Sequence, residues 1–218
     1  MAAQRKTRVA ILISGRGSNM VSILDAARAP DYPAEIALVL SNRPDAPGLA
    51  HAAACGIPTK TVDHRSFPDR ASFDGALQAE LEAAGIELVC LAGFMRIFSG
   101  PFVEAWAGRM INIHPSLLPL FRGVHTHAQA LAAGVRLHGC TVHYVVPELD
   151  AGPIVAQAAV PVLPGDDPDS LAARILVQEH RLYPMALALV AGGRARLEGN
   201  RVVFAGDVAT PEGALLSL

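Results

Sequence analysis

Residues 9–19 read VAILISGRGSN, which places a short apolar run directly before a glycine-rich turn. The run has the length of a buried strand, and the glycines and serine after it are typical of a turn between elements. Residues 19–29 then carry Met20, Ile23 and Leu24 on one side of a helical pattern. This stretch therefore predicts a strand, a turn and a helix in succession, the basic unit of an α/β fold.

The same alternation continues through the first half of the chain. We expect strands at residues 9–14, 35–41, 57–62, 88–92 and 110–113, and helices at residues 19–29, 48–54 and 72–84. Continuously apolar strands separated by helices are typical of parallel sheets that are covered on both faces. The predicted fold class is α/β: a Rossmann-like, mostly parallel sheet with helices on both faces.

The pattern changes after Pro119. We expect a helix at residues 127–133, paired strands at 140–146 and 154–160, a long helix at 169–189 and a strand at 201–204. Pro184 should kink or divide the long helix, because proline has no N–H to donate. We expect residues 1–191 to form a single domain, to which residues 192–218 add a C-terminal strand and tail.

Composition narrows the class of protein. Of the 218 residues, 51% are hydrophobic and 17% are charged, which is typical of a globular chain and not of a disordered one. The net charge of −2 gives no general attraction to nucleic acid. The first apolar run is too short to span a membrane, and no signal-peptide cleavage pattern follows it. Cys55, Cys90 and Cys140 form no CxxC pair. We expect a cytoplasmic protein without nucleic-acid or membrane partners.

Residues 111–119 read INIHPSLLP and hold the strongest candidates for chemistry. Asn112 and His114 are two residues apart on a predicted strand, so they share a face while Ile111 and Ile113 point into the core. An amide N–H beside an imidazole suits a carbonyl group that becomes an oxyanion. The alternative is a strand end whose polar residues only face water.

The glycine-rich turn at residues 13–19 is a candidate anion site. Glycine lets the backbone approach a ligand, and the N–H groups at a helix N-terminus favour an anion. The sequence is neither G-x-G-x-x-G nor a P-loop, because the lysine is missing. An ordinary turn capped by Ser18 or Asn19 is the alternative.

Asp150 lies in the turn ELDAGP, where aspartate is common for backbone reasons alone. A carboxylate close to His114 would favour the protonated imidazole.

His125 and His127 could ligate zinc together with a third group, but no cysteine partner or HExxH spacing accompanies them, so we expect no metal. Glu179 is either a solvated helix residue or a ligand group at a cleft.

Three further histidines have no motif around them. We expect His51, His64 and His138 to be surface residues or to make local hydrogen bonds.

Taken in order, these segments resemble the phosphoribosylglycinamide formyltransferases, folate-dependent enzymes of purine synthesis. The resemblance covers about residues 9–191. It rests on ISGRGSN at 13–19, LAGFMRI at 91–97, NIHPSLLP at 112–119, GVHTH at 123–127, ELDAGP at 148–153 and QEH at 178–180. It implies the formyltransferase fold, with the active site near the ends of the strands.

The resemblance also implies a reaction and a set of residues. The co-substrate would be 10-formyltetrahydrofolate, and the acceptor would be the amine of glycinamide ribonucleotide. The implied catalytic residues are Asn112, His114 and Asp150. The implied nucleotide-binding residues are Gly17, Ser18 and Asn19 at the phosphate and Glu179 at the ribose. The implied folate-binding residues are Arg70, Met95, Arg96, Ile97, Phe98, Val146, Pro147, Glu148 and Leu149.

The chain departs from the family pattern in the loop after Pro119. This loop reads Leu120-Phe121-Arg122-Gly123, where the family pattern has a lysine and a proline before the glycine. Arg122-Gly123 is closer to methionyl-tRNA formyltransferase, which shares the Asn-x-His and Asp core. Asp150-Ala151-Gly152 also replaces a double glycine.

Three alternative functions follow. A methionyl-tRNA formyltransferase would need a second domain and a basic face, and the length and net charge count against both. A 10-formyltetrahydrofolate hydrolase would use the same core with water as acceptor. A non-enzymatic nucleotide-binding module would explain the glycine-rich turn but not the three catalytic candidates. We expect only small-molecule partners and a monomer or homodimer.

Overall fold

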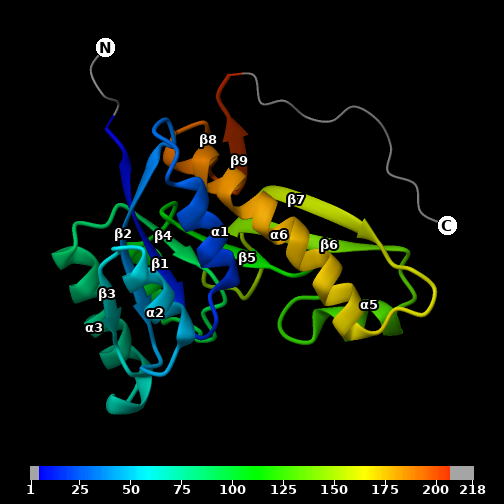
Figure 1. The fold of residues 1–218 in the computed structure, drawn as a ribbon, viewed down its shortest axis with the longest axis horizontal. Helices are drawn as coiled ribbons and strands as arrows, with labels where there is room; N and C mark the ends of the chain where they lie inside the picture. The colour runs from blue at the N-terminus through cyan, green and yellow to red at the C-terminus, as the bar shows by residue number, and fades with distance from the viewer. Residues whose placement is uncertain (1–4, 207–218) are drawn as a thin grey trace.

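The computed structural model describes residues 5–206 of the chain. A seven-stranded sheet runs through it in the order β3-β2-β1-β4-β5-β6-β7 (Figure 1). Its strands are β1 (Thr7–Ile13), β2 (Ala34–Ser41), β3 (Thr59–Thr61), β4 (Leu88–Leu91), β5 (Met110–His114), β6 (Leu137–Tyr144) and β7 (Ile154–Pro161). The first five strands are parallel, and β6 and β7 join antiparallel. The predicted mostly parallel sheet is confirmed.

Helices cover both faces of this sheet (Figure 1). They are α1 (Ser18–Ala26), α2 (Pro47–Ala54), α3 (Arg70–Ala83), α4 (Gly100–Ala105), α5 (Thr126–Ala132) and α6 (Pro168–Ala191), with a 3-10 helix η1 at His64–Ser66. The central strand shows why the apolar runs are continuous. Val9, Ile11 and Ile13 belong to the core beneath α1 and α6, whereas Ala10 and Leu12 belong to the core beneath α3 and α4. Both faces of β1 are therefore buried.

Of the two predicted effects of Pro184, a kink or a division of the helix, the division is wrong, because α6 runs unbroken through this residue. Pro184 is buried, and the hydroxyl of Tyr32 donates to its carbonyl oxygen at 2.7 Å. The helix packs along α1, β6 and β7. Burial against neighbouring elements is the usual source of helix stability in proteins. Here it offsets the loss of one backbone hydrogen bond at Pro184.

The structure also contains elements that the periodicity did not reveal. Helix α4 was not predicted, nor was β8 (Ala195–Glu198). Strand β9 (Arg201–Phe204) was predicted, and it pairs with β8 in an antiparallel hairpin (Figure 1). The predicted tail beyond this hairpin includes residues 207–218, which lie outside the described residues.

The carboxyl ends of β1, β4 and β5 meet at one edge of the sheet. The backbone N–H of Ser14, just after β1, donates to the carbonyl of Gly93, just after β4, at 3.1 Å. The buried hydroxyl of Tyr183 on α6 lies 3.0 Å from the carbonyl oxygen of Leu91 and 3.1 Å from that of Ile111. These contacts hold the loops that carry the candidate residues close together.

Candidate active site

Asn112 and His114 lie on the same face of β5, as their spacing predicts. Ile111 and Ile113 point the other way and are buried. The side chain of Asn112 is half-buried, and His114 is buried with only 5% of its surface exposed. The pair therefore does not form a solvated strand end, because the imidazole of His114 is withdrawn from water.

Asp150 reaches this pair from the loop between β6 and β7. Its Oδ2 lies 3.5 Å from Nδ1 of His114 and accepts a hydrogen bond of 2.8 Å from the backbone N–H of Gly123. Its backbone takes the left-handed conformation, with φ at 49°. The three residues expected to carry the chemistry are thus brought together from two segments that are far apart in sequence.

His143 is a fourth member of this cluster, and the sequence reasoning did not include it among the site residues. It lies directly opposite Asn112 in the β5–β6 register, and its Nε2 is 3.2 Å from Nδ2 of Asn112. Its Nδ1 lies 2.9 Å from the carbonyl oxygen of Tyr144, so Nδ1 donates and Nε2 accepts. Burial lowers the pKa of His143, although the Tyr144 carbonyl and Asp150 oppose this effect. A neutral His143 therefore orients the amide of Asn112.

The backbone of Phe121 supplies the other partner of His114. Nε2 of His114 lies 3.0 Å from the carbonyl oxygen of Phe121, and a carbonyl can only accept, so Nε2 carries a proton. Nδ1 is then the nitrogen that faces Asp150. Phe121 has φ at 55°, a left-handed conformation that is uncommon for a bulky residue. The sequence could not reveal this contact, because it uses a backbone atom.

The glycine-rich turn leads into α1 as predicted. Gly17 precedes the helix with φ at 71°, a conformation that glycine adopts without strain. Nδ2 of the buried Asn19 donates to Oε2 of Glu179 on α6 at 2.7 Å. Burial raises the pKa of Glu179, while Asn19 and His114 act in the opposite direction. The structure thus brings Asn19 and Glu179 into contact beside the start of α1.

The expected folate-binding residues lie on three segments. Arg70 begins α3, residues 95–98 follow β4, and residues 146–149 follow β6. Met95, Ile97 and Leu149 are 68%, 58% and 52% exposed, which is unusual for large apolar side chains grouped on loops. Phe98 differs from them, because it is buried.

The ring of Phe98 stacks between two others in the core. Its centroid lies 5.3 Å from that of Phe94 and 4.7 Å from that of Phe102. Phe98 therefore packs the loop at residues 95–98 onto the core, and little of its surface can contact a ligand.

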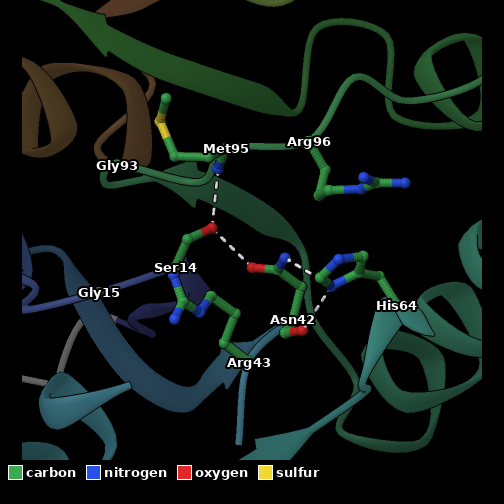
Figure 2. A pocket seen from close by; sticks show the side chains of 8 residues that line it. All are labelled: Ser14, Gly15, Asn42, Arg43, His64, Gly93, Met95 and Arg96. Atoms are coloured by element: carbon green, nitrogen blue, oxygen red, sulfur yellow. Dashed lines mark hydrogen bonds between the residues drawn. The ribbon is translucent and has the colours of Figure 1, made fainter. Parts of the chain in front are cut away.

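Two cavities adjoin the candidate residues. One, of about 500 Å³, is lined by Asp150, Arg122 and part of β9 among others. The other, of about 330 Å³, includes Met95 and Arg96 in its lining (Figure 2). Of the three catalytic candidates, Asp150 lines the first cavity, and neither lining includes Asn112 or His114.

His138 contradicts the expectation of a surface or locally bonded residue. It is fully buried, and neither ring nitrogen has a hydrogen-bond partner among the described residues. Its ring packs edge-on against Phe121 and His127. Burial, with smaller contributions from His127 and His114, lowers the pKa of His138 to about 4. It is therefore a neutral core residue packed against Phe121.

The remaining histidines are less unusual. His64 makes the local contacts expected of it, to Asn42, and His51 is exposed. His125 precedes α5 with φ at 58°.

Across residues 5–206, no three His, Cys, Asp or Glu side chains are grouped so that they could hold a metal ion. None of the helices in the same range combines the length and hydrophobicity needed to cross a membrane.

Comparison with known proteins identifies relatives over nearly the whole chain. The formyl transferase family matches residues 7–187. Phosphoribosylglycinamide formyltransferase of Escherichia coli is 43% identical over 94% of this chain and 97% of its own length. The human trifunctional purine biosynthetic protein adenosine-3 is 49% identical over 90% of this chain, but the chain spans only 20% of that protein.

Solved structures give the same result for the fold. Glycinamide ribonucleotide transformylase 1 from Symbiobacterium toebii superposes with a TM-score of 0.89 at 48% sequence identity. The match covers 92% of this chain and 95% of the other. The family match covers most of the chain, and the E. coli relative is matched over nearly its whole length. The chain therefore belongs to the formyl transferase family.

Proposed function

We propose that this protein transfers the formyl group of 10-formyltetrahydrofolate to the amine of glycinamide ribonucleotide. The observation that carries the proposal is the cluster of Asn112, His114 and Asp150, oriented by His143 and the Phe121 carbonyl. An amide donor, an imidazole and a carboxylate are the groups that acyl transfer to an amine requires. The names of the E. coli and S. toebii relatives support the choice of acceptor.

The reaction begins when the amine attacks the formyl carbon. The nitrogen lone pair forms the new C–N bond, and the carbonyl π electrons move to oxygen, which becomes an oxyanion. Asn112 donates one N–H to this oxygen, since His143 accepts the other. His114 in its imidazolium form donates through Nδ1, since the Phe121 carbonyl accepts from its Nε2–H. Its contact with Asp150, at 3.5 Å, is long enough for the substrate oxygen to share the proton.

Collapse of the tetrahedral intermediate completes the transfer. Asp150 accepts the proton that the amine loses, through water, and this proton passes to the folate nitrogen as the C–N bond to that nitrogen breaks. Charge and atoms balance, and the products are formylglycinamide ribonucleotide and tetrahydrofolate. The enzyme supplies orientation of two bound reactants and stabilisation of the oxyanion, which are large terms in such reactions.

The proposed binding residues are those that the family resemblance implies. Gly17, Ser18 and Asn19 hold the phosphate of the nucleotide at the start of α1, where N–H groups favour an anion. Glu179, fixed by Asn19, contacts the ribose. The folate lies against Arg70, the loop at residues 95–98 and the loop at residues 146–149.

We predict that Asn112→Ala lowers kcat by about 10²–10³, because one oxyanion donor is lost. Steady-state kinetics at saturating concentrations of both substrates measures this. Thermal unfolding of the variant should match that of the parent protein, which separates lost catalysis from lost structure. Turnover close to that of the parent protein would contradict the role of Asn112.

One assay distinguishes the alternative functions. Release of tetrahydrofolate from 10-formyltetrahydrofolate is followed with and without glycinamide ribonucleotide. Release only with the nucleotide is the expected result. Release without it would indicate a hydrolase, and formylation of methionyl-tRNA instead would indicate the tRNA enzyme. No release under any of these conditions would favour a binding module.

A further inference from the structure

The loop after β5 holds two of the proposed catalytic residues through its backbone. Nε2 of His114 donates to the carbonyl oxygen of Phe121 at 3.0 Å. Two residues further on, the N–H of Gly123 donates to Oδ2 of Asp150 at 2.8 Å. The position of residues 121–123 therefore sets the place of His114 relative to Asp150, whose Oδ2 lies 3.5 Å from Nδ1 of that histidine.

The residue between these two backbone contacts makes an ion pair. Nη1 of Arg122 lies 2.7 Å from Oε1 of Glu148, and the two side chains are 39% and 73% exposed. Glu148 stands two positions before Asp150, so the pair joins the loop after β5 to the loop between β6 and β7. The same two loops are also joined by the hydrogen bond from Gly123 to Asp150.

Packed side chains give these loops little support on one side. A cavity of about 500 Å³ lies there, and both Arg122 and Asp150 contribute to its lining. Asp150 also keeps a left-handed backbone, with φ at 49°, a conformation that is uncommon outside glycine. Such conformations persist only where neighbouring contacts hold them. Polar links between the loops must therefore replace part of the missing packing.

The ion pair also lies where the sequence departs from the family pattern. The loop reads Leu120-Phe121-Arg122-Gly123, where the family pattern has a lysine and a proline before the glycine. Proline fixes its own φ and so stiffens a loop through the backbone. Arginine does not, but its guanidinium can bind a carboxylate on a facing loop. Arg122 thus restrains the loop through its side chain.

We propose that Arg122 and Glu148 are positioning residues that hold the segment 121–123 against the loop carrying Asp150. The proposal rests on the proposed formyl transfer. The pair acts through the backbone groups of this segment, and neither side chain contacts the reacting atoms.

Loss of the pair should change the kinetic constants selectively. The imidazole of His114 and the carboxylate of Asp150 shift relative to each other, so kcat falls. Residues 146–149, the proposed folate loop, lose a tether, so KM for 10-formyltetrahydrofolate rises. KM for glycinamide ribonucleotide stays the same, because residues 17–19, the proposed phosphate loop, lie directly before and in α1.

The test is a charge swap. Arg122→Glu removes an attraction and adds a repulsion, and it should lower kcat/KM for the folate about tenfold. Glu148→Arg should have a similar effect. The double variant restores opposite charges and should return kcat/KM to within about threefold of the parent value, whereas independent residues would multiply their losses to about a hundredfold.

A second measurement does not depend on turnover. Hydrogen exchange of the Gly123 N–H, followed by NMR, reports how often its bond to Asp150 opens. Exchange should be about tenfold faster in Arg122→Glu and should return toward the parent rate in the double variant. Thermal unfolding of each variant should match that of the parent protein, because both side chains lie at the surface.

Arg5→Glu is the matched control. Arg5 pairs with Glu87 at 2.7 Å, its side chain is 81% exposed, and the variant makes the same change in net charge as Arg122→Glu. The two residues lie just before β1 and β4, at the edge of the sheet opposite the candidate site. This variant should leave kcat, both KM values and the exchange of Gly123 within about twofold of the parent values.

Two results would overturn the proposal. One is a double variant in which the two losses multiply, and the other is Gly123 exchange that is unchanged in Arg122→Glu. Absence of turnover in the parent protein would instead count against the proposed formyl transfer. The exchange measurement would then still decide whether the pair holds the two loops together.

Discussion

Phe121 links His114, the proposed catalytic histidine, to the buried His138. Its carbonyl accepts from Nε2 of His114, while its ring packs edge-on against His138 at 5.6 Å between centroids. The left-handed backbone at this position costs roughly 1–2 kcal/mol, so the residue needs an anchor to keep it. The ring contact is that anchor, and Phe121 is a positioning residue for His114.

We predict that Phe121→Ala lowers kcat about tenfold with little change in either KM. Loss of the ring frees the backbone to leave the left-handed region, and His114 then loses an acceptor worth about 1 kcal/mol. Phe121→Tyr should retain the activity, because it keeps the ring. Steady-state kinetics of the two variants provides the comparison. Equal loss in both, or a rise in KM alone, would argue against a positioning role.

For individual residues, the sequence predicts which side chains belong to the candidate site better than it predicts the groups that hydrogen-bond to them. The spacing of Asn112 and His114 placed both on one face of β5, and Asp150 was found by its turn and by the family resemblance. His143 could not be assigned to the site, because its place opposite Asn112, 31 positions away in sequence, depends on the antiparallel register of β5 and β6. The Phe121 carbonyl is a backbone atom that no side-chain motif reveals.

A side chain of helix α6 ties strands β4 and β5 to each other. The hydroxyl of Tyr183 lies within hydrogen-bond distance of the carbonyl oxygens of Leu91 and Ile111, at the ends of β4 and in β5. Burial strongly raises the pKa of Tyr183, so the hydroxyl keeps its proton and acts as a donor. The helix thereby fixes the spacing of the strands beside the proposed catalytic residues Asn112 and His114.

We predict that Tyr183→Phe lowers the free energy of unfolding by about 1–3 kcal/mol, because buried carbonyl oxygens lose a donor and no water replaces it. Urea unfolding followed by the fluorescence of Trp106, which is buried and is the chain's single tryptophan, measures this. Tyr32→Phe is the control. Tyr32 donates to Pro184 on the same helix but is half-buried, so its loss should cost less. An equal cost in both variants would contradict the argument.

Elements with strong periodicity were predicted closely, and elements without it were not. The helix found at Arg70–Ala83 was expected at residues 72–84, and most strands differ by a few residues at their ends. Helix α4 has only six residues, too few to show a helical repeat. Pro184 was expected to divide α6 on local grounds, but the burial of the helix against α1, β6 and β7 decides its continuity.

Across the whole molecule, buried histidines set how stability depends on pH. Burial lowers the pKa of His127, His138 and His143, that of His138 to about 4. Between pH 6.5 and about 4 the unfolded chain therefore binds protons that the folded protein does not. The free energy of unfolding must fall as the pH falls through this range. Carboxylates affect stability at lower pH. Arg65 holds the pKa of Asp63 near 2, so the stability that ionised Asp63 contributes is lost only below about pH 4.

We predict that His138→Phe makes this loss of stability shallower, since unfolding then takes up about one proton fewer in this range. The substitution keeps a ring against Phe121 and His127 and removes two nitrogens without partners among the described residues. Urea unfolding at several pH values between 7 and 4.5 gives the slope. His51→Phe changes an exposed histidine and should leave the slope unchanged. A slope that stays the same in His138→Phe would mean that His138 is protonated in the folded protein at these pH values, and the interior behind the catalytic loop would then have to hold a charge.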